Sequence, residues 1–320
     1  MRESQAIERL RRIATAPGAL GLADDAALLD GLVLTHDTIA EGVHFLSTDP
    51  AASVGWKLVA VNLSDIAAKG ARPAAALLSL TLSDDELWDM SFLDGIEAAC
   101  ESYGLALLGG DTIALPAGAP RVFGLTAIGR AGERTPLRSG ARQGDSLWVV
   151  GTLGDAAAGL AQLQSDPAST GQLVEVYQRP VPQLAAGAAL APHATAMMDV
   201  SDGLLLDASR IAQASGCGLE IDLGSLPLSA SFVRERGDGA DARLFAATGG
   251  DDYALLLTLP AALDPLSLSL PKRTTISRIG RVDAQGKRLS LVSNGKAVPL
   301  PERLGHEHRG NSTSAMADRI

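Results

Sequence analysis

The sequence contains few aromatic residues and only two cysteines. Aromatic residues make up 3% of its 320 residues, so leucine, valine, isoleucine and alanine must fill the hydrophobic core. Apolar residues, at 46%, are abundant enough for that. Cys100 and Cys217 form no CxxC pair, which argues against a structural zinc site. Both are typical of ordinary thiols in a reducing compartment.

Long apolar runs and an excess of basic residues are also missing. No run of about 18 apolar residues occurs, which argues against a membrane span. The first residues, MRESQAIERLRRIA, predict a charged amphipathic helix rather than a signal peptide. The formal net charge of −10 argues against a nucleic-acid surface, which needs a basic patch. We therefore expect a cytoplasmic protein that binds neither membrane nor nucleic acid.

The common phosphate-binding and hydrolase motifs are absent too. The sequence contains no GxxxxGK[ST], no GxGxxG, no HExxH and no GxSxG. These absences exclude a P-loop and a Rossmann fingerprint. A polyphosphate ligand would therefore have to bind through a different arrangement of residues.

Strands and helices alternate along the chain, which predicts an α/β (α+β) fold. Apolar runs predict strands at 31–36, 74–82, 105–112, 121–130, 146–151 and 194–203, followed by strands in GLEIDL and YALLLTL. Helical patterns cover 3–15, 52–69, a segment from the cap Ser83 to about 102, and two segments between 155 and 190. The stretch Gly129–Gly144 is rich in Arg and Gly, which predicts two domains, 1–135 and 136–320.

Aspartates beside small or hydroxylated residues recur at the ends of these elements. The six sites are Asp24-Asp25, Thr35-His36-Asp37, Ser64-Asp65, Gly109-Gly110-Asp111, Asp199-Val200-Ser201-Asp202 and Gly249-Gly250-Asp251-Asp252. Mg²⁺ prefers oxygen ligands and is often held by carboxylates together with phosphate oxygens. Clustered carboxylates would repel a phosphate unless metal ions bridged the two. The pattern therefore predicts several magnesium ions.

Asp65 is the most informative of these aspartates. It lies in KLVAVNLSDIAAKG, a predicted helix that is apolar nearly all round and is therefore expected to be buried. Asn62 shares its helix face. A buried carboxylate costs several kcal/mol unless it is paired or binds a cation. Asp65 thus either binds metal, pairs with an arginine or caps a neighbouring backbone. Lys69 fits a favourable charge in the last helical turn.

Two further aspartates follow apolar strands. Asp111 comes after Gly109 and Gly110, which would let the backbone approach a ligand closely, although a simple tight turn is the alternative. Asp199 ends a second apolar strand. Ser201 or Asp202 beyond it would also make a good helix N-cap.

Arg138 and His44 are candidates to contact phosphate groups. An arginine can bind phosphate through two parallel hydrogen bonds, and Arg134 and Arg142 are competing candidates for that role. His44 follows the first aspartate-bearing strand and could contact a substrate phosphate. A structural role is the alternative for this lone histidine.

These residues, in this order, resemble the thiamine-monophosphate kinases, a family of the aminoimidazole-ribotide-synthetase-like superfamily. The matching stretches are GLADDAALL, THDTIAEGVHF, DPAASVGWKLVAVNLSDIAAKGARP, LGGDT, RTPLRSGARQGD, DVSDGLLLD and GGDDYALLLT. They run in order from about residue 20 to 258. The resemblance implies a two-domain fold in which each domain is a mixed sheet packed with helices. It also implies a homodimer formed through the N-terminal halves.

The resemblance further implies a reaction and a set of site residues. ATP would donate its γ-phosphoryl group to thiamine monophosphate and give thiamine diphosphate, with several Mg²⁺ ions taking part in a cleft between the domains. The implied magnesium ligands are Asp25, Thr35, Asp37, Asp65, Asp111, Asp199 and Asp202. The implied ATP contacts are Gly110, Asp111, Arg138 and Ser201, and the implied substrate contacts are His44 and Asp251. No covalent nucleophile is expected.

Three positions depart from the family pattern. His36 stands where the family usually has a small hydroxylated residue, and Asp251 replaces a glutamate that is one methylene longer. The family also often has an aromatic residue near the C-terminus that stacks on thiamine, where this chain offers His308 or Arg309.

Two alternative functions stay open on the sequence. The first is a sister enzyme such as a selenophosphate synthetase, although the reactive N-terminal Cys or Sec of that enzyme is missing here. The second is a non-catalytic metal-binding protein, and the absence of an EF-hand loop argues against it.

Overall fold

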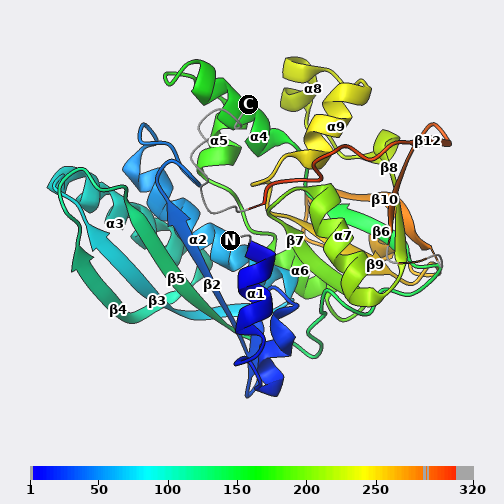
Figure 1. Cartoon of the computed structure of the whole chain (residues 1–320), viewed down its shortest axis with the longest axis horizontal. Helices are drawn as coiled ribbons and strands as arrows, with labels where there is room; N and C mark the ends of the chain where they lie inside the picture. The colour runs from blue at the N-terminus through cyan, green and yellow to red at the C-terminus, as the bar shows by residue number, and fades with distance from the viewer. Residues whose placement is uncertain (1–2, 284–285, 287, 308–320) are drawn as a thin grey trace.

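The computed structural model describes residues 3–283, 286 and 288–307 of the chain. Each half of the molecule contains one β-sheet, and Figure 1 shows the N-terminal half on the left and the C-terminal half on the right. Within the described residues, no helix has both the length and the apolar character needed to cross a membrane. Cys217 is buried, Cys100 is half-buried and both are free thiols, as predicted.

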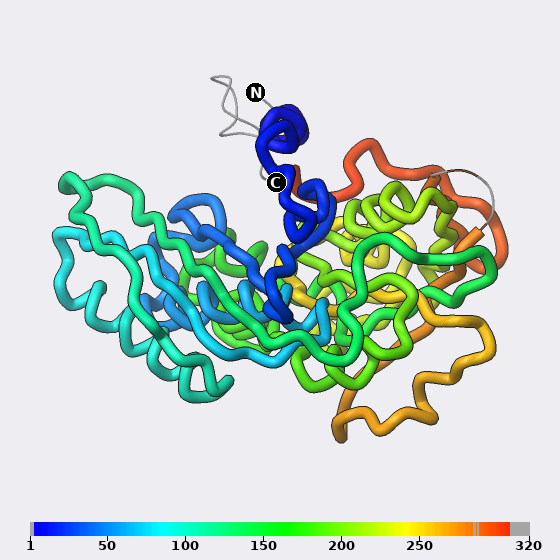
Figure 2. The backbone as a smooth tube through the Cα atoms, turned by 90° about the horizontal axis from the view of Figure 1, so that it is seen from below, coloured from blue at the N-terminus to red at the C-terminus, as the bar shows by residue number. Residues whose placement is uncertain are grey.

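The N-terminal sheet has five strands in the order β1-β2-β5-β3-β4. Its strands are β1 (Ala27–Leu29), β2 (Leu32–Ala40), β3 (Arg72–Leu82), β4 (Ala106–Ala114) and β5 (Val122–Arg130). β3 and β4 are parallel and the other neighbours are antiparallel, which confirms the predicted mixed sheet. The helical segments of this half are α1 (Glu3–Leu10), η1 (Pro17–Leu22), α2 (Ala51–Ala68) and α3 (Glu86–Tyr103). The segment containing α1 projects from the junction of the two halves (Figure 2).

The C-terminal sheet has seven strands in the order β12-β11-β8-β10-β6-β9-β7. Its strands are β6 (Ser146–Val150), β7 (Ala196–Val200), β8 (Gly218–Asp222), β9 (Ala254–Leu259), β10 (Ile276–Asp283), β11 (Leu289–Ser293) and β12 (Lys296–Val298). Its helices are α4 (Asp155–Ser165), α5 (Gln172–Gln178), α6 (Leu184–Leu190), α7 (Leu204–Ser215), α8 (Ala230–Arg236) and α9 (Ala240–Thr248), with short turns η2 (Leu223–Ser225) and η3 (Pro265–Ser267). β8 and β11 are parallel, so this sheet is mixed as well.

Helix α2 lies between the two halves and connects them. On one side it packs against β2, β5 and α3, and on the other it packs against α6, β7 and β9. Because both sides are covered, nearly every residue of α2 is buried, as the sequence predicted. The buried residues include Lys57, Asn62, Ser64 and Asp65, whose polar groups therefore need partners inside the protein.

Two predicted helix boundaries were wrong, and one alternative is excluded. The helix predicted from Ser83 begins at Glu86, because Asp85 caps it by accepting a hydrogen bond from the Trp88 backbone N–H at 3.0 Å. The helix predicted over 3–15 ends at Leu10 and continues as turns. The simple tight turn that was the alternative at Gly110 is absent, since this residue lies inside β4 and its backbone packs tightly on β3.

Candidate active site

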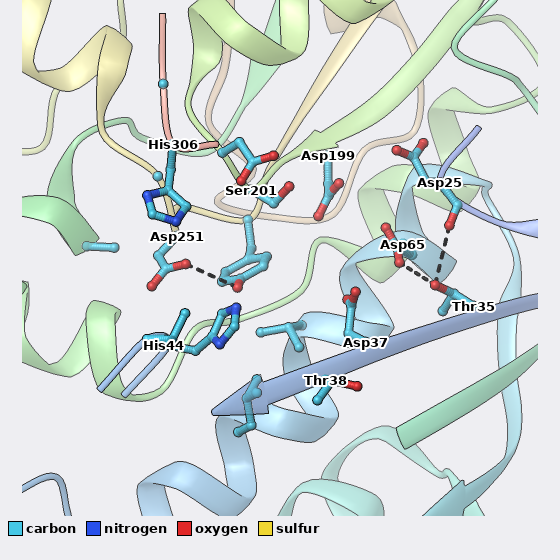
Figure 3. Close-up of a pocket in the computed structure, with 18 of the residues that line it drawn as sticks. Asp25, Thr35, Asp37, Thr38, His44, Asp65, Asp199, Ser201, Asp251 and His306 are labelled. Carbon is cyan, nitrogen blue, oxygen red and sulfur yellow. Dashed lines mark hydrogen bonds between the residues drawn. The ribbon is translucent and has the colours of Figure 1, made fainter. Parts of the chain in front are cut away.

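A cavity of about 1020 Å³ opens between the two halves of the chain. Its walls come from β2, the C-terminal part of α2, the end of β7 and the loop 249–253, together with residues of α1 and α4. Figure 3 shows how carboxylates and hydroxyl groups from these separate elements point into the same space. This arrangement agrees with the expectation of a cleft between the two domains.

Asp25, Asp65 and Asp199 form the centre of the polar wall (Figure 3). They come from the loop before β1, from α2 and from β7, and one carboxylate oxygen of each lies within 4.8 Å of the others. Thr35 on β2 donates a hydrogen bond to Asp65, and Ser64 donates one to Asp199 at 2.7 Å. The fold thus collects three of the predicted metal ligands, with Thr35 beside them.

Burial of these carboxylates makes their negative charge costly. Burial, followed by repulsion from Asp37, Asp199 and Asp25, raises the pKa of Asp65 well above its ordinary value. Burial and then the charge of Asp25 raise the pKa of Asp199 to about 8. A divalent cation between the three would supply the balancing charge, and oxygen-only donors are what Mg²⁺ prefers. The residues present therefore fit a hard cation.

Asp37 extends this acidic wall along β2. Thr35 and Asp37 are two residues apart on the strand and so face the same side. The Asp37 backbone N–H donates to the Asn62 side chain at 2.9 Å, which ties the strand to α2. Burial raises the pKa of Asp37 to about 6. His36, on the alternate face, contacts the Thr126 hydroxyl at 2.9 Å.

Ser201 and Asp202 follow β7 and also line the cavity. Their backbone N–H groups donate to the Asp207 carboxylate, each at 3.1 Å, so Asp207 holds this turn. Arg210 bridges Asp202 and Asp207 with contacts of 2.6 Å. The glycine before α7, Gly203, is its N-cap and makes no side-chain cap bond, so neither Ser201 nor Asp202 caps that helix.

Two substrate candidates, His44 and Asp251, lie at the other end of the cavity (Figure 3). Lys57 of α2 holds the two segments together. Its ammonium donates one hydrogen bond to the His44 carbonyl at 2.9 Å and another to the Asp251 carboxylate at 2.8 Å. The Tyr253 hydroxyl also donates to Asp251, at 3.3 Å. Sequence reasoning missed Lys57, although a lysine inside an all-apolar helix was a usable signal, since a buried ammonium must have partners.

Arg138 and Lys69 both contact Asp25. Arg138 donates to Asp25 through Nε at 2.7 Å, and its backbone N–H donates to Asp24 at 2.8 Å. Lys69 forms ion pairs with Asp24 at 2.5 Å and with Asp25 at 2.6 Å. Burial would raise the pKa of Asp25, but Lys69 and Arg138 outweigh it and lower that pKa. The interpretation of Lys69 as a favourable charge in the last helical turn was therefore wrong, since it is the C-cap and its side chain points inward.

Gly110 and Asp111 lie outside the cavity of this chain. They are exposed on β4, which is an edge strand of the N-terminal sheet. Asp252 has a structural position, where it accepts hydrogen bonds from the Gly154 and Ala156 backbone at the start of α4. His308 and Arg309 lie outside the described residues. His306, which sequence reasoning passed over, lines the cavity beside Asp251 (Figure 3).

Comparisons with known proteins identify the family. Residues 23–131 match the AIR synthase related protein, N-terminal domain, and residues 142–291 match the corresponding C-terminal domain. The thiamine-monophosphate kinase of Salmonella typhimurium is 39% identical over 306 residues, which cover 90% of this chain and 91% of that protein. The chain belongs to the thiamine-monophosphate kinase family. The family member of Caulobacter vibrioides is 37% identical over 94% of this chain and 89% of its own length.

Solved structures of thiamine-monophosphate kinases have the same fold. The structure described as AaThiL complexed with AMPPCP and TMP superimposes with a TM-score of 0.82 at 32% identity, covering 96% of this chain and 97% of that one. The kinase of Stenotrophomonas maltophilia gives a TM-score of 0.73 at 38% identity, with 92% and 96% covered. The hydrogenase maturation protein HypE in complex with ATP, at 20% identity and a TM-score of 0.70, shares the fold.

Proposed function

We propose that this chain transfers the γ-phosphoryl group of ATP to the phosphate of thiamine monophosphate and releases thiamine diphosphate and ADP. The observation that carries the proposal is the cluster of Asp25, Asp65 and Asp199 on the wall of a cavity shared by both halves. Its support is the 39% identity to a thiamine-monophosphate kinase along 90% of the chain. The AaThiL structure complexed with AMPPCP and TMP supports the same pair of substrates.

We propose that the segments 1–135 and 136–320 form two domains, each of which contributes part of the active-site cavity. The first supplies most of the acidic wall, and the second completes the cavity with β7 and the loop around Asp251. The proposed magnesium-binding residues of this cavity are Asp25, Thr35, Asp37, Asp65, Asp199 and Asp202. Mg²⁺ bound there supplies positive charge to the ATP phosphates, which the acidic wall alone would repel.

The remaining cavity residues would align the substrates. The Arg138 side chain is 22% exposed beside Asp25, so its guanidinium can also reach a phosphate group from the cavity wall. Ser201 is held in its turn by Asp207 and presents its hydroxyl to the same space. His44 and Asp251, fixed by Lys57, would hold the acceptor at the opposite end. The two substrates would then meet inside the cavity.

This chemistry needs alignment more than it needs a base. The attacking atom is an oxygen of the thiamine monophosphate phosphate group, which is largely ionised near neutral pH because its second pKa is ~6. That oxygen forms a bond to the γ-phosphorus while the bond to the ADP oxygen breaks. The transition state is loose and spreads negative charge over the equatorial oxygens. Alignment of the two substrates and neutralisation of this charge by cationic groups therefore contribute most of the rate.

We further propose that two copies of the chain associate through β4. This edge strand exposes Leu107, Leu108 and Ile113, and an exposed apolar edge is prone to pair with another chain. Gly110 and Asp111 lie on the same strand. Their proposed role in ATP and metal binding therefore requires a second copy to bring them to a cavity.

An acceptor comparison tests the proposed reaction. Purified protein with ATP and Mg²⁺ is given thiamine monophosphate, free thiamine or no acceptor, each acceptor at saturating concentration, and both ADP and the phosphorylated product are quantified. We expect equal amounts of ADP and thiamine diphosphate from thiamine monophosphate, and no product from thiamine. Equal turnover of thiamine, or ADP release without a phosphorylated acceptor, would refute the proposed substrate.

A further inference from the structure

The ammonium group of Lys69 contacts Asp25 of the acidic cluster and is shielded from solvent. Lys69 follows α2 and its side chain is 1% exposed. Its Nζ lies 2.5 Å from Asp24 and 2.6 Å from Asp25, and it donates a hydrogen bond to the Met197 carbonyl at 3.2 Å. These three partners surround the charge and belong to both halves of the chain. Lys69 therefore has a fixed position in the folded protein.

Lys69 and Arg138 differ in their freedom to leave Asp25. Arg138 also contacts Asp25, but its side chain is 22% exposed and lines the cavity, so a ligand can draw it away. The Lys69 side chain is 1% exposed and is not among the residues that line the cavity. Burial would lower the pKa of Lys69, yet the charges of Asp25 and Asp24 outweigh burial and raise it. The contacts of its Nζ with Asp24 at 2.5 Å and with Asp25 at 2.6 Å keep the positive charge of Lys69 against these two carboxylates.

We propose that the Lys69 ammonium neutralises Asp24 and Asp25. It thereby takes the place of a divalent ion that these carboxylates would otherwise bind. The inference depends on the proposed metal-binding role of Asp25, Asp65 and Asp199. A fixed positive charge in contact with Asp25 repels any divalent ion that approaches the same carboxylate. The cluster of this chain therefore takes up fewer divalent ions before ATP arrives than its carboxylates could bind.

Manganese binding without nucleotide tests this role directly. Mn²⁺ alone is titrated into metal-free protein, and free Mn²⁺ is followed by electron paramagnetic resonance. For Lys69→Met we expect one additional Mn²⁺ per chain, or a tightest Kd that is lowered at least tenfold. Lys69→Arg keeps the charge and should retain the wild-type stoichiometry. Lys57→Met is the matched control, since Lys57 is a buried, ion-paired lysine of α2 that contacts Asp251 instead of the cluster.

The outcomes separate the role of Lys69 from the proposed metal site. If wild-type protein binds Mn²⁺ and Lys69→Met binds it with the same stoichiometry and a Kd within twofold, Lys69 is only structural and the inference is wrong. If Lys69→Met does not fold, Lys69→Gln removes the charge but keeps a hydrogen-bond donor, and the same criteria apply. If neither wild-type nor variant protein binds Mn²⁺, the metal site itself fails and the role of Lys69 fails with it.

Discussion

Burial and repulsion from neighbouring carboxylates make the negative charge of Asp65 unfavourable in the folded protein. We expect Asp65→Asn to lower kcat with thiamine monophosphate by at least about 100-fold, because loss of a metal-bound charge removes several kcal/mol of transition-state stabilisation. The metal-free variant should be at least as stable as wild type, since repulsion from Asp37, Asp199 and Asp25 is relieved. Activity at saturating Mg²⁺ and the Tm in EDTA measure the two effects.

Asp145→Asn is the matched control for this experiment. Asp145 is also buried, but it accepts a hydrogen bond from the Thr195 hydroxyl at 2.6 Å within the C-terminal half. Its replacement should lower the Tm and leave kcat nearly unchanged. If Asp65→Asn kept more than about a tenth of the wild-type kcat, a loss below ~1.4 kcal/mol, its assignment as a metal ligand would be withdrawn.

At this scale the sequence predicted the carboxylates better than their partners. Asp25, Asp65 and Asp199 were expected to be metal ligands, and the fold does bring their oxygens together. The ion pairs of Lys57 and Lys69 could not be predicted, because their partners lie in other segments and meet them only after folding. A local rule about helix ends therefore gave Lys69 the wrong role.

Two glycines allow helices α2 and α3 to approach each other closely. A Cβ on Gly55 would lie 2.1 Å from the Phe92 carbonyl oxygen, and one on Gly95 would lie 2.0 Å from the Ala52 carbonyl oxygen. Since both obstacles are backbone atoms, they cannot rotate away. We expect Gly95→Ala to destabilise the protein by about 1–3 kcal/mol or more, as overpacking does, measured by urea unfolding.

Gly239→Ala provides the comparison for this substitution. A Cβ at Gly239 meets no atom within 4 Å, so its free energy of unfolding should change little. Equal stability of the Gly95→Ala variant and wild type would contradict the tight contact between α2 and α3.

The secondary-structure elements that the sequence predicted best are those with continuous apolar runs. β3, β5, β6 and β9 were expected within a few residues of their observed ends, because buried strands give a strong signal. β10 was not predicted, since its sequence ISRIGRVD mixes charged and apolar residues. β4 was also predicted within two residues of its observed ends, and only the tight turn that its glycines could have marked is absent. Gly110 instead permits close strand contact, since a Cβ there would lie 1.8 Å from the Leu78 oxygen.

The buried carboxylates also make the stability of the whole metal-free molecule depend on pH. Asp37 and Asp199, whose pKa values are raised by burial to about 6 and about 8, hold protons in the folded state that the unfolded chain has released. Unfolding therefore becomes easier as pH rises, and the Tm in EDTA should fall between pH 5 and pH 8. Asp199→Asn should flatten this decline, and added Mg²⁺ should oppose it. A Tm that rises over this range in EDTA would show that these carboxylates do not titrate as described.

At the level of assembly, we predict that two copies of the chain associate through β4. Leu108 on β4 is 66% exposed, and Leu108→Arg should convert a dimer into a monomer, as measured by light scattering after size-exclusion chromatography. Leu266→Arg is the control, because Leu266 is 70% exposed but belongs to the C-terminal half. If Leu108→Arg stays dimeric, the second copy binds elsewhere. The cytoplasmic location and the domain boundary at 135/136 stay predictions.

The stereochemistry of phosphoryl transfer tests the central claim, that the cavity aligns two bound substrates for one direct displacement. ATP that is chiral at the γ-phosphorus is used with thiamine monophosphate, and the configuration at phosphorus is determined in the thiamine diphosphate product. One in-line displacement inverts the configuration, and inversion is the predicted result. Retention would mean two displacements through a phosphorylated enzyme, which would contradict a site whose residues only bind, align and neutralise charge.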